Sequence, residues 1–216
     1  MKNKNHYLLG GTFALLLFVI LGYTVKFAPQ GLTAFDSHLQ EQLRGDLPTF
    51  WTSFFSTITQ LANSGVIVIW VGALVGFFYY KKWKAEAGLL LTALISSGLL
   101  VLLLKPIYAR PRPSIPHLVH ETGFSFPSGH SLGITLVVGA LIIIASQRIS
   151  KSGLRLACQL ALGLLILTIL VSRVYLGVHY PSDVTAGFLL GLACLQIVFP
   201  FYDQLRFKWR FSGKAK

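Results

Sequence analysis

The stretch AGLLLTALISSGLLVLLL, residues 87–104, contains no charged residue and consists mostly of leucine and other apolar residues. A helix needs about 20 predominantly apolar residues to cross the roughly 30 Å hydrocarbon core of a bilayer. We therefore predict that this stretch is a transmembrane helix and that the chain is a membrane protein.

Five more apolar blocks of similar length lie at 7–25, 64–80, 131–146, 154–171 and 184–202. The composition agrees with them: 54% of the 216 residues are hydrophobic, 12% are charged, and the mean hydropathy is +0.65. Such a chain has too little polar surface to cover a water-soluble globule. We predict an all-α, polytopic membrane protein, with a single domain of six transmembrane helices over 1–216 and the first block retained as a span.

The positive residues alternate between the connections of these six spans. Positive residues in short loops stay on the cytoplasmic side of a membrane. One side receives most of the 19 Lys and Arg residues, namely Lys2, Lys4, Lys81, Lys82, Lys84, Arg148, Lys151, Arg155, Arg206, Lys208, Arg210, Lys214 and Lys216. We therefore place the chain in the cell membrane with both termini cytoplasmic.

The net charge of +12 needs no further partner to explain it. Most of it follows from this topology and from tails that face anionic lipid headgroups. We expect membrane lipids around the protein, no nucleic-acid partner, and no obligate protein partner.

The segment 27–63 on the opposite side has apolar residues at helical spacing, followed by an aromatic cluster. The helical set is Leu32, Phe35, Leu39 and Leu43, and the aromatic set is Phe50, Trp51, Phe54 and Phe55. Such a stretch suits a helix in the membrane interface. It could cap the bundle or form one wall of a lateral entrance for lipid, and the sequence leaves both interpretations open.

Four cations stand on the side that the topology otherwise depletes of positive charge: Lys105, Arg110, Arg112 and Arg173. An ionisable residue near the membrane is costly and indicates a functional site. Arginine offers planar paired donors that match phosphate oxygens, whereas lysine offers a point charge. These residues therefore predict a bound anion on this side.

The block Phe126-Pro-Ser-Gly-His130 directly precedes the fourth span. Proline is favoured at a helix start, where the first backbone N–H groups have no intrahelical partner and can receive an anion. Gly129 removes a side chain where a ligand would approach. His130 can hold a transferable proton near neutral pH.

The block Ser172-Arg-Val-Tyr-Leu-Gly-Val-His-Tyr-Pro-Ser-Asp183 joins the fifth and sixth spans. Asp183 follows His179 by four residues and can bind one imidazole nitrogen, which leaves the other nitrogen free as a nucleophile or base. Each block alone is a common pattern. The topology places all of them on one face at the ends of adjacent spans, and together they predict a catalytic site.

These blocks resemble the signature of the type-2 phosphatidic acid phosphatase (lipid phosphate phosphatase) superfamily. The matching patterns are Lys-x6-Arg-Pro from Lys105 to Pro113, Pro-Ser-Gly-His from Pro127 to His130, and Ser-Arg-x5-His-x3-Asp from Ser172 to Asp183. An Arg-Pro pair occurs twice, and the family spacing selects Arg112 over Arg110. The small six-span form is similar to the bacterial phosphatidylglycerophosphate phosphatase type.

The resemblance implies a membrane lipid phosphatase that acts at the outer face through a phosphohistidine. It implies that His179 attacks phosphorus, that Asp183 orients it, and that His130 protonates the leaving oxygen. The implied phosphate-binding groups are Lys105, Arg112, Ser128, Gly129 and Arg173. We expect no metal and no cofactor: His117 and His120 have only Glu121 beside them, too few ligands for a metal site.

The best substrate expectation is phosphatidylglycerophosphate, hydrolysed to phosphatidylglycerol. An undecaprenyl pyrophosphate phosphatase, or a broader enzyme that also accepts phosphatidic acid, is the alternative. A transporter or channel with an anion site, and an inactive relative that acts as a scaffold, are the competing classes. A bell-shaped pH profile is expected, since one histidine must be neutral and the other protonated.

Overall fold

The computed structural model describes residues 4–212, with side chains through Trp209, and the regular structure of this part is entirely helical. Lys2, Lys214, Lys216 and the side chain of Arg210 lie outside the described residues. The helices are α1 (Lys4–Phe27), α2 (Gln30–Arg44), α3 (Thr49–Ile58), the 3-10 turn η1 (Thr59–Ala62), α4 (Ser64–Tyr80), α5 (Lys84–Tyr108), α6 (Gly129–Arg148), α7 (Ser152–Tyr175) and α8 (Pro181–Ser212). The predicted all-α membrane fold is confirmed.

Each of the six apolar blocks lies within one helix. Five helices of the described chain are long and apolar enough to cross a membrane, namely α1, α5, α6, α7 and α8. The segment Thr49–Ala62 and the helix α4 pass the same test together, with a bend of 56° between them. Asn63 lies at this bend, and counting the pair as one broken span gives six.

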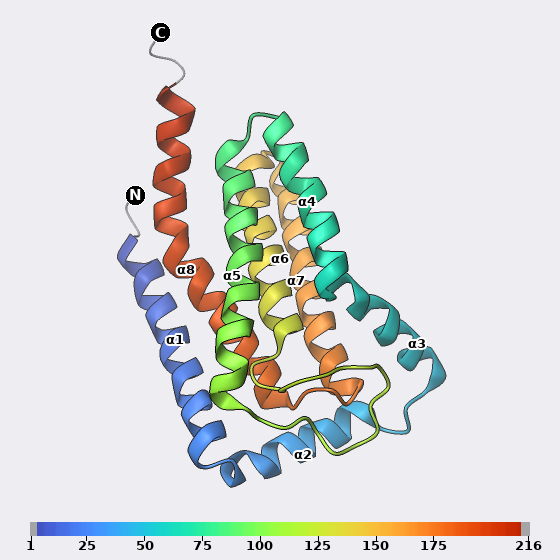
Figure 1. Ribbon diagram of the computed structural model, residues 1–216. Helices are drawn as coiled ribbons and strands as arrows, with labels where there is room; N and C mark the ends of the chain where they lie inside the picture. The colour runs from blue at the N-terminus through green and yellow to red at the C-terminus, as the bar shows by residue number, and fades with distance from the viewer. Residues whose placement is uncertain (1–3, 213–216) are drawn as a thin grey trace.

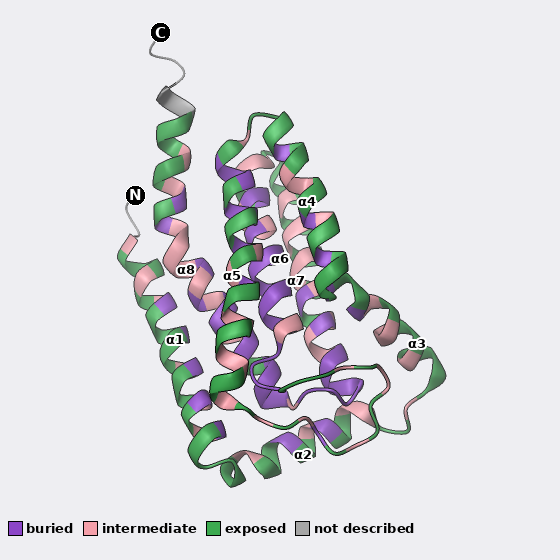
Figure 2. Ribbon diagram, in the orientation of Figure 1, coloured by how far each residue is buried: buried purple, intermediate pink, exposed green. Residues whose placement is uncertain are grey.

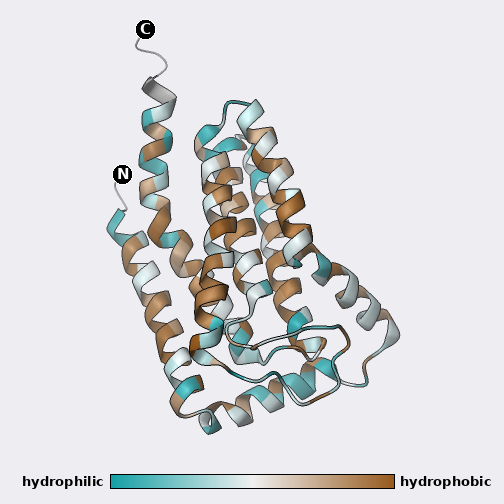
Figure 3. Cartoon of the chain, in the orientation of Figure 1, coloured by the Kyte–Doolittle hydropathy of each residue, from teal (hydrophilic) through white to brown (hydrophobic). Residues whose placement is uncertain are grey.

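Helix α6 forms the centre of the bundle, packed against α5, α7 and α8 (Figure 1). Most of its residues are buried, whereas the outer helices expose one side (Figure 2). That outer surface is apolar along the middle of the helices (Figure 3), with Ile69 74% and Leu102 70% exposed. Exposed apolar side chains on the outer helices fit a lipid surround and not water.

Helices α6 and α8 approach closely where both begin. A Cβ atom on Gly187 of α8 would lie 2.7 Å from the carbonyl oxygen of Ser128, so only glycine allows this contact. The close approach places the first turn of α8 beside the first turn of α6, which brings two of the motif blocks together.

The connections divide between the two ends of the bundle (Figure 1). The start of α1, the end of α8 and the short connections 81–83 and 149–151 lie at one end, where the buried Glu86 binds Arg148 and Arg206. The long loop 109–128 and the turn 176–180 lie at the other end, with α2 running across it. The single-domain organisation stays a prediction.

Candidate active site

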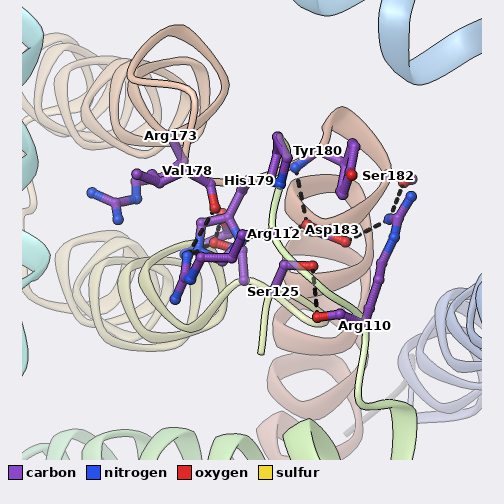
Figure 4. Close-up of polar contacts among 12 residues, drawn as sticks. Arg110, Arg112, Ser125, Arg173, Val178, His179, Tyr180, Ser182 and Asp183 are labelled. Atoms are coloured by element: carbon purple, nitrogen blue, oxygen red, sulfur yellow. Dashed lines mark hydrogen bonds and ion pairs between the residues drawn. The ribbon is translucent and has the colours of Figure 1, made fainter. Parts of the chain in front are cut away.

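The three motif blocks meet at the end of the bundle that α2 crosses. Loop 109–128 runs from α5 to α6; its Arg112 reaches the turn between α7 and α8, and its Arg110 reaches the first turn of α8 (Figure 4). Segments far apart in sequence thus contribute side chains to one cluster.

His179 lies in the turn between α7 and α8 and is 1% exposed. Its Nε2 is 3.3 Å from Nη1 of Arg112. A guanidinium only donates hydrogen bonds, so this contact assigns the lone pair to Nε2 and the proton to Nδ1. Nδ1 faces Oδ2 of Asp183 at 3.5 Å, and the arrangement leaves the lone pair on Nε2.

The protonation state of His179 also follows from its surroundings. Burial, followed by the charges of Arg173 and Arg112, lowers the pKa of its imidazole well below the ordinary value. The ring is therefore neutral at physiological pH, which is the form a nucleophile requires.

Asp183 lies in the first turn of α8 and is fully buried. Its Oδ2 accepts a hydrogen bond from the backbone N–H of Tyr180 at 2.9 Å, and its Oδ1 accepts one from Arg110 at 2.6 Å. Both oxygens thus have fixed partners, and Oδ2 is the one turned toward the imidazole of His179.

A cluster of cations surrounds one carboxylate, that of Glu121. The side chain of Arg173 is buried, donates to Oγ1 of Thr59 at 2.8 Å and forms an ion pair with Glu121. Arg112 approaches the same carboxylate at 3.4 Å, and Nδ1 of His130 lies 3.7 Å from it. The Glu121 carboxylate therefore occupies the position where these cations would bind another anion.

Lys105 completes the charge of this site from the last turn of α5, where it is half-buried. Its ammonium interacts electrostatically with Arg112, Glu121 and Arg173. Lys105 thus adds a third positive charge within electrostatic range of Arg112 and Arg173 at this end of the bundle.

Ser128 and Gly129 begin α6. The buried Oγ of Ser128 caps the helix by accepting from the backbone N–H of Ser131 at 3.4 Å and from the Ser131 hydroxyl at 3.0 Å. A Cβ atom on Gly129 would meet only Val101 at an ordinary 3.5 Å. Packing within the protein therefore does not explain the glycine, and direct phosphate contact by either residue stays a prediction.

His130 is held by a residue that the sequence patterns did not single out. Its Nε2 lies 2.8 Å from Oδ1 of Asn63, at the break before α4. This contact turns Nδ1 toward Glu121 and the centre of the anion site. The signal available in the sequence was modest, since asparagine is a favoured residue just before a helix.

Two further acids take unexpected places, and one arginine, Arg110, binds carboxylates behind the site. Glu121, considered only beside His117 and His120, binds the cations of the site. Arg110 forms ion pairs with Asp36 and Asp183. Asp36 follows Leu32 by one helical turn, so a carboxylate on the apolar face of 27–63 was the signal that could have found it.

The two loop histidines do not form a metal site with Glu121. Nε2 of His117 lies 2.9 Å from the carbonyl oxygen of Pro113. Among the described residues no group of three or more His, Cys, Asp or Glu side chains is placed to hold a metal ion. The described groups bring together a buried imidazole with its lone pair on Nε2, a second histidine, and a cluster of cations around one carboxylate.

The family model described as the PAP2 superfamily matches residues 86–207, more than half of the chain. The chain is 34% identical over 154 residues to phosphatidylglycerophosphatase B of Bacillus subtilis, covering 69% of this chain and 74% of that protein. It is also 34% identical over 123 residues to the lipid A 1-phosphatase of Rhizobium etli, covering 52% of this chain and 47% of that protein.

Two solved structures share the fold. The crystal structure of the first transmembrane PAP2 type phosphatidylglycerolphosphate phosphatase from Bacillus subtilis has a TM-score of 0.81 at 27% identity, covering 90% of this chain and 96% of that one. The Aquifex aeolicus LpxE structure has a TM-score of 0.61 at 24% identity, covering 76% and 94%, a likeness in fold alone.

Proposed function

Because this chain belongs to the PAP2 superfamily, we propose that it is a membrane lipid phosphatase whose nucleophile is His179. The observation that carries the proposal is the geometry of this histidine. Nε2 holds the lone pair, Nδ1 faces a buried carboxylate, and a cationic site lies directly beside the ring. The likeness to two lipid phosphatases supports the same conclusion.

In the proposed reaction Nε2 of His179 attacks the phosphorus atom of the lipid phosphate. The bond between phosphorus and the lipid oxygen breaks, and His130 gives its proton to that oxygen. A water molecule, deprotonated by the now neutral His130, then attacks the phosphohistidine and releases inorganic phosphate. Asp183 stabilises the positive charge that develops on His179.

The non-bridging oxygens would bind Lys105, Arg112 and Arg173, together with the hydroxyl of Ser128 and the backbone N–H of Gly129. Arg112 and Arg173 are paired with Glu121, so the phosphate has to displace that carboxylate. Phosphoryl transfer depends mainly on positioning and on charge stabilisation. We propose that the three cations meet this need and that the reaction requires no metal ion.

The proposed substrate is phosphatidylglycerophosphate, the phosphate monoester named for a relative and for a solved structure. Phosphate release should be measured with the purified full chain in detergent and EDTA. Undecaprenyl pyrophosphate and phosphatidic acid serve as parallel substrates, His179→Ala as the inactive variant, and the exposed His38→Ala as its matched control.

We expect the wild type and His38→Ala to release phosphate in EDTA, with phosphatidylglycerophosphate preferred, and His179→Ala to release none. If undecaprenyl pyrophosphate is preferred, the proposed substrate is wrong, but the proposed histidine mechanism still holds. Loss of wild-type activity in EDTA would contradict metal independence. If no lipid releases phosphate, the proposal that this chain is a phosphatase is wrong and an anion transporter is favoured.

We also propose that the catalytic end of the bundle faces the outside of the cell and that both chain ends face the cytoplasm. The basic residues near the opposite end support this orientation. A membrane-impermeant thiol reagent applied to whole cells should label Ser114→Cys and not Lys151→Cys, both positions being exposed. The reverse pattern would invert the topology. The unmodified chain, which has Cys158 and Cys194, sets the background.

A further inference from the structure

We infer that Arg110 and Asp36 are positioning residues for catalysis, which hold the carboxylate of Asp183 ionised and turned toward His179 without touching the phosphate. The inference rests on the proposed function, because it assigns a support to the proposed nucleophile. Through Asp36, the helix α2, which lies outside the candidate spans, would then support the reaction.

The contacts of Asp183 separate its two oxygens. Oδ1 accepts from Nη1 of Arg110 at 2.6 Å. Oδ2 accepts from the backbone N–H of Tyr180 at 2.9 Å and is the oxygen that faces Nδ1 of His179. Arg110 therefore fixes the rotation of the carboxylate by occupying the oxygen that the histidine does not use.

Arg110 is itself held from several sides. Its Nη2 donates to Oδ2 of Asp36 at 2.8 Å, and its Nη1 also donates to the hydroxyl of Ser182 at 2.7 Å. The ring of Tyr180 stacks on the guanidinium, with 4.0 Å between Cζ and the ring centroid. A planar fork can bridge two carboxylates in this way, whereas a lysine ammonium cannot reproduce the geometry.

Asp36 reaches the same place from α2 and is 2% exposed. Its Oδ1 accepts from the backbone N–H of Ser182 at 2.9 Å, and its Oδ2 accepts from the Ser182 hydroxyl at 2.7 Å. Backbone N–H groups in the first turn of a helix have no intrahelical partner. Asp36 thus fixes the turn of α8 that carries Asp183.

The charges explain why the support matters. A buried carboxylate stays ionised only when a cation or several hydrogen bonds compensate it. The charged or titratable groups around Asp183 are Arg110, Asp36, His179 and Tyr180, with Lys105 and Arg112 acting at longer range. Without Arg110 the carboxyl takes up a proton more readily, and a protonated acid no longer stabilises a positive imidazole.

The two arginines of the doubled Arg-Pro pair therefore have different tasks. Arg112 points to His179 and the anion site, whereas Arg110 lies on the other side of Asp183 (Figure 4). The Arg110 fork binds Asp36 and Asp183, carboxylates that support His179 and that the proposed phosphate does not displace, whereas Arg112 is paired with Glu121 at the anion site.

The test compares Arg110→Ala, Arg110→Lys and Asp36→Asn with wild type, using the purified full chain and phosphatidylglycerophosphate. We expect kcat to fall about 10- to 100-fold, the usual cost of losing a supporting partner. KM and inhibition by orthovanadate, a tetrahedral phosphate analogue, should stay near the wild-type values. The activity of Arg110→Ala should recover as the pH rises, because the unsupported acid then ionises.

Two comparison variants separate the roles. Arg112→Ala should lose orthovanadate inhibition, as expected for a phosphate ligand. Arg44→Ala should keep wild-type kinetics, because Arg44 ties α2 to the carbonyl oxygens of Tyr175 and Pro116 without reaching Asp183. It therefore controls for general loosening of α2.

The inference is overturned if Arg110→Ala keeps the wild-type kcat, or if its orthovanadate inhibition weakens as in Arg112→Ala. If Arg110→Ala does not fold, Arg110→Lys and Asp36→Asn decide by the same criteria. An inactive wild type would refute the proposed function itself. An active wild type whose Arg110 variants keep the wild-type kcat would refute only the inference about Arg110.

Discussion

Replacement of Asp183 by asparagine tests the central pair of the site with little change in shape. Asparagine can keep its oxygen toward Arg110, which places its amide NH2 where Oδ2 lies. It then carries no charge, can donate to Nδ1 of His179, and no longer accepts the backbone N–H of Tyr180. Donation would move the imidazole proton to Nε2, the nitrogen that must attack. The variant thus removes both the charge and the correct tautomer.

The size of the effect follows from the distance. Unit charges 3.5 Å apart, the separation of Nδ1 and Oδ2, interact by about 5 kcal/mol at an effective dielectric constant of about 20. A loss of this size in the transition state lowers the rate roughly 10³- to 10⁴-fold. We expect Asp183→Asn to lower kcat by that factor.

The assay is phosphate release at saturating phosphatidylglycerophosphate, with enough enzyme to follow the slow variant. Asp203→Asn is the matched control, since Asp203 lies on the same helix and binds Gln147 at 3.3 Å, away from the site. It should keep wild-type kcat. If Asp183→Asn stays within about tenfold of wild type, a difference of only about 1.4 kcal/mol, the assigned role of the acid is wrong.

Three further outcomes follow from the described contacts. Asn63→Ala should lower kcat/KM, which reports the steps up to departure of the leaving group, for a lipid alcohol but not for p-nitrophenol, which needs no proton from His130; equal losses of kcat/KM for both would show that Asn63 does not act through the acid. Burial and then the nearby guanidinium groups lower the pKa of His179, and the neutral ring attacks, so the acid limb of kcat/KM should fall below the ordinary value of about 6.5; a limb at or above it would contradict a neutral buried nucleophile. Glu86→Gln leaves two arginines without their buried partner and should cost about 3 kcal/mol of stability, seen as a lower Tm with unchanged kcat; an unchanged Tm would show that the cluster is not stabilising.

The membrane fold could be predicted because a span needs only length and apolarity, both of which are local properties. The bend in the span formed by Thr49–Ala62 and α4 was harder to predict. The block 64–80 is one helix, but the preceding segment continues it at a 56° bend, and no local pattern encodes such an angle. The spacing of the motif residues along the chain predicted that they meet at one end of the bundle, and their roles stay predictions.

The supporting contacts could not be predicted, because they join residues distant in sequence. Asp36 and Arg110 are 74 positions apart, and Asn63 and His130 are 67 apart. Which helix face meets which loop depends on packing of the whole bundle. Glu121 shows the same limit, since nothing in its neighbourhood in the sequence indicates that it pairs with Arg173.

The family match begins at residue 86 and ends at residue 207. That interval includes the signature and Arg110, but it excludes Asp36 and Asn63, which contact Arg110 and His130. A chimera that joined residues 86–207 to the first helices of another protein would carry the complete signature and still lack both partners. Segment exchange among such proteins therefore has to transfer α2 and the break before α4 together with the motifs.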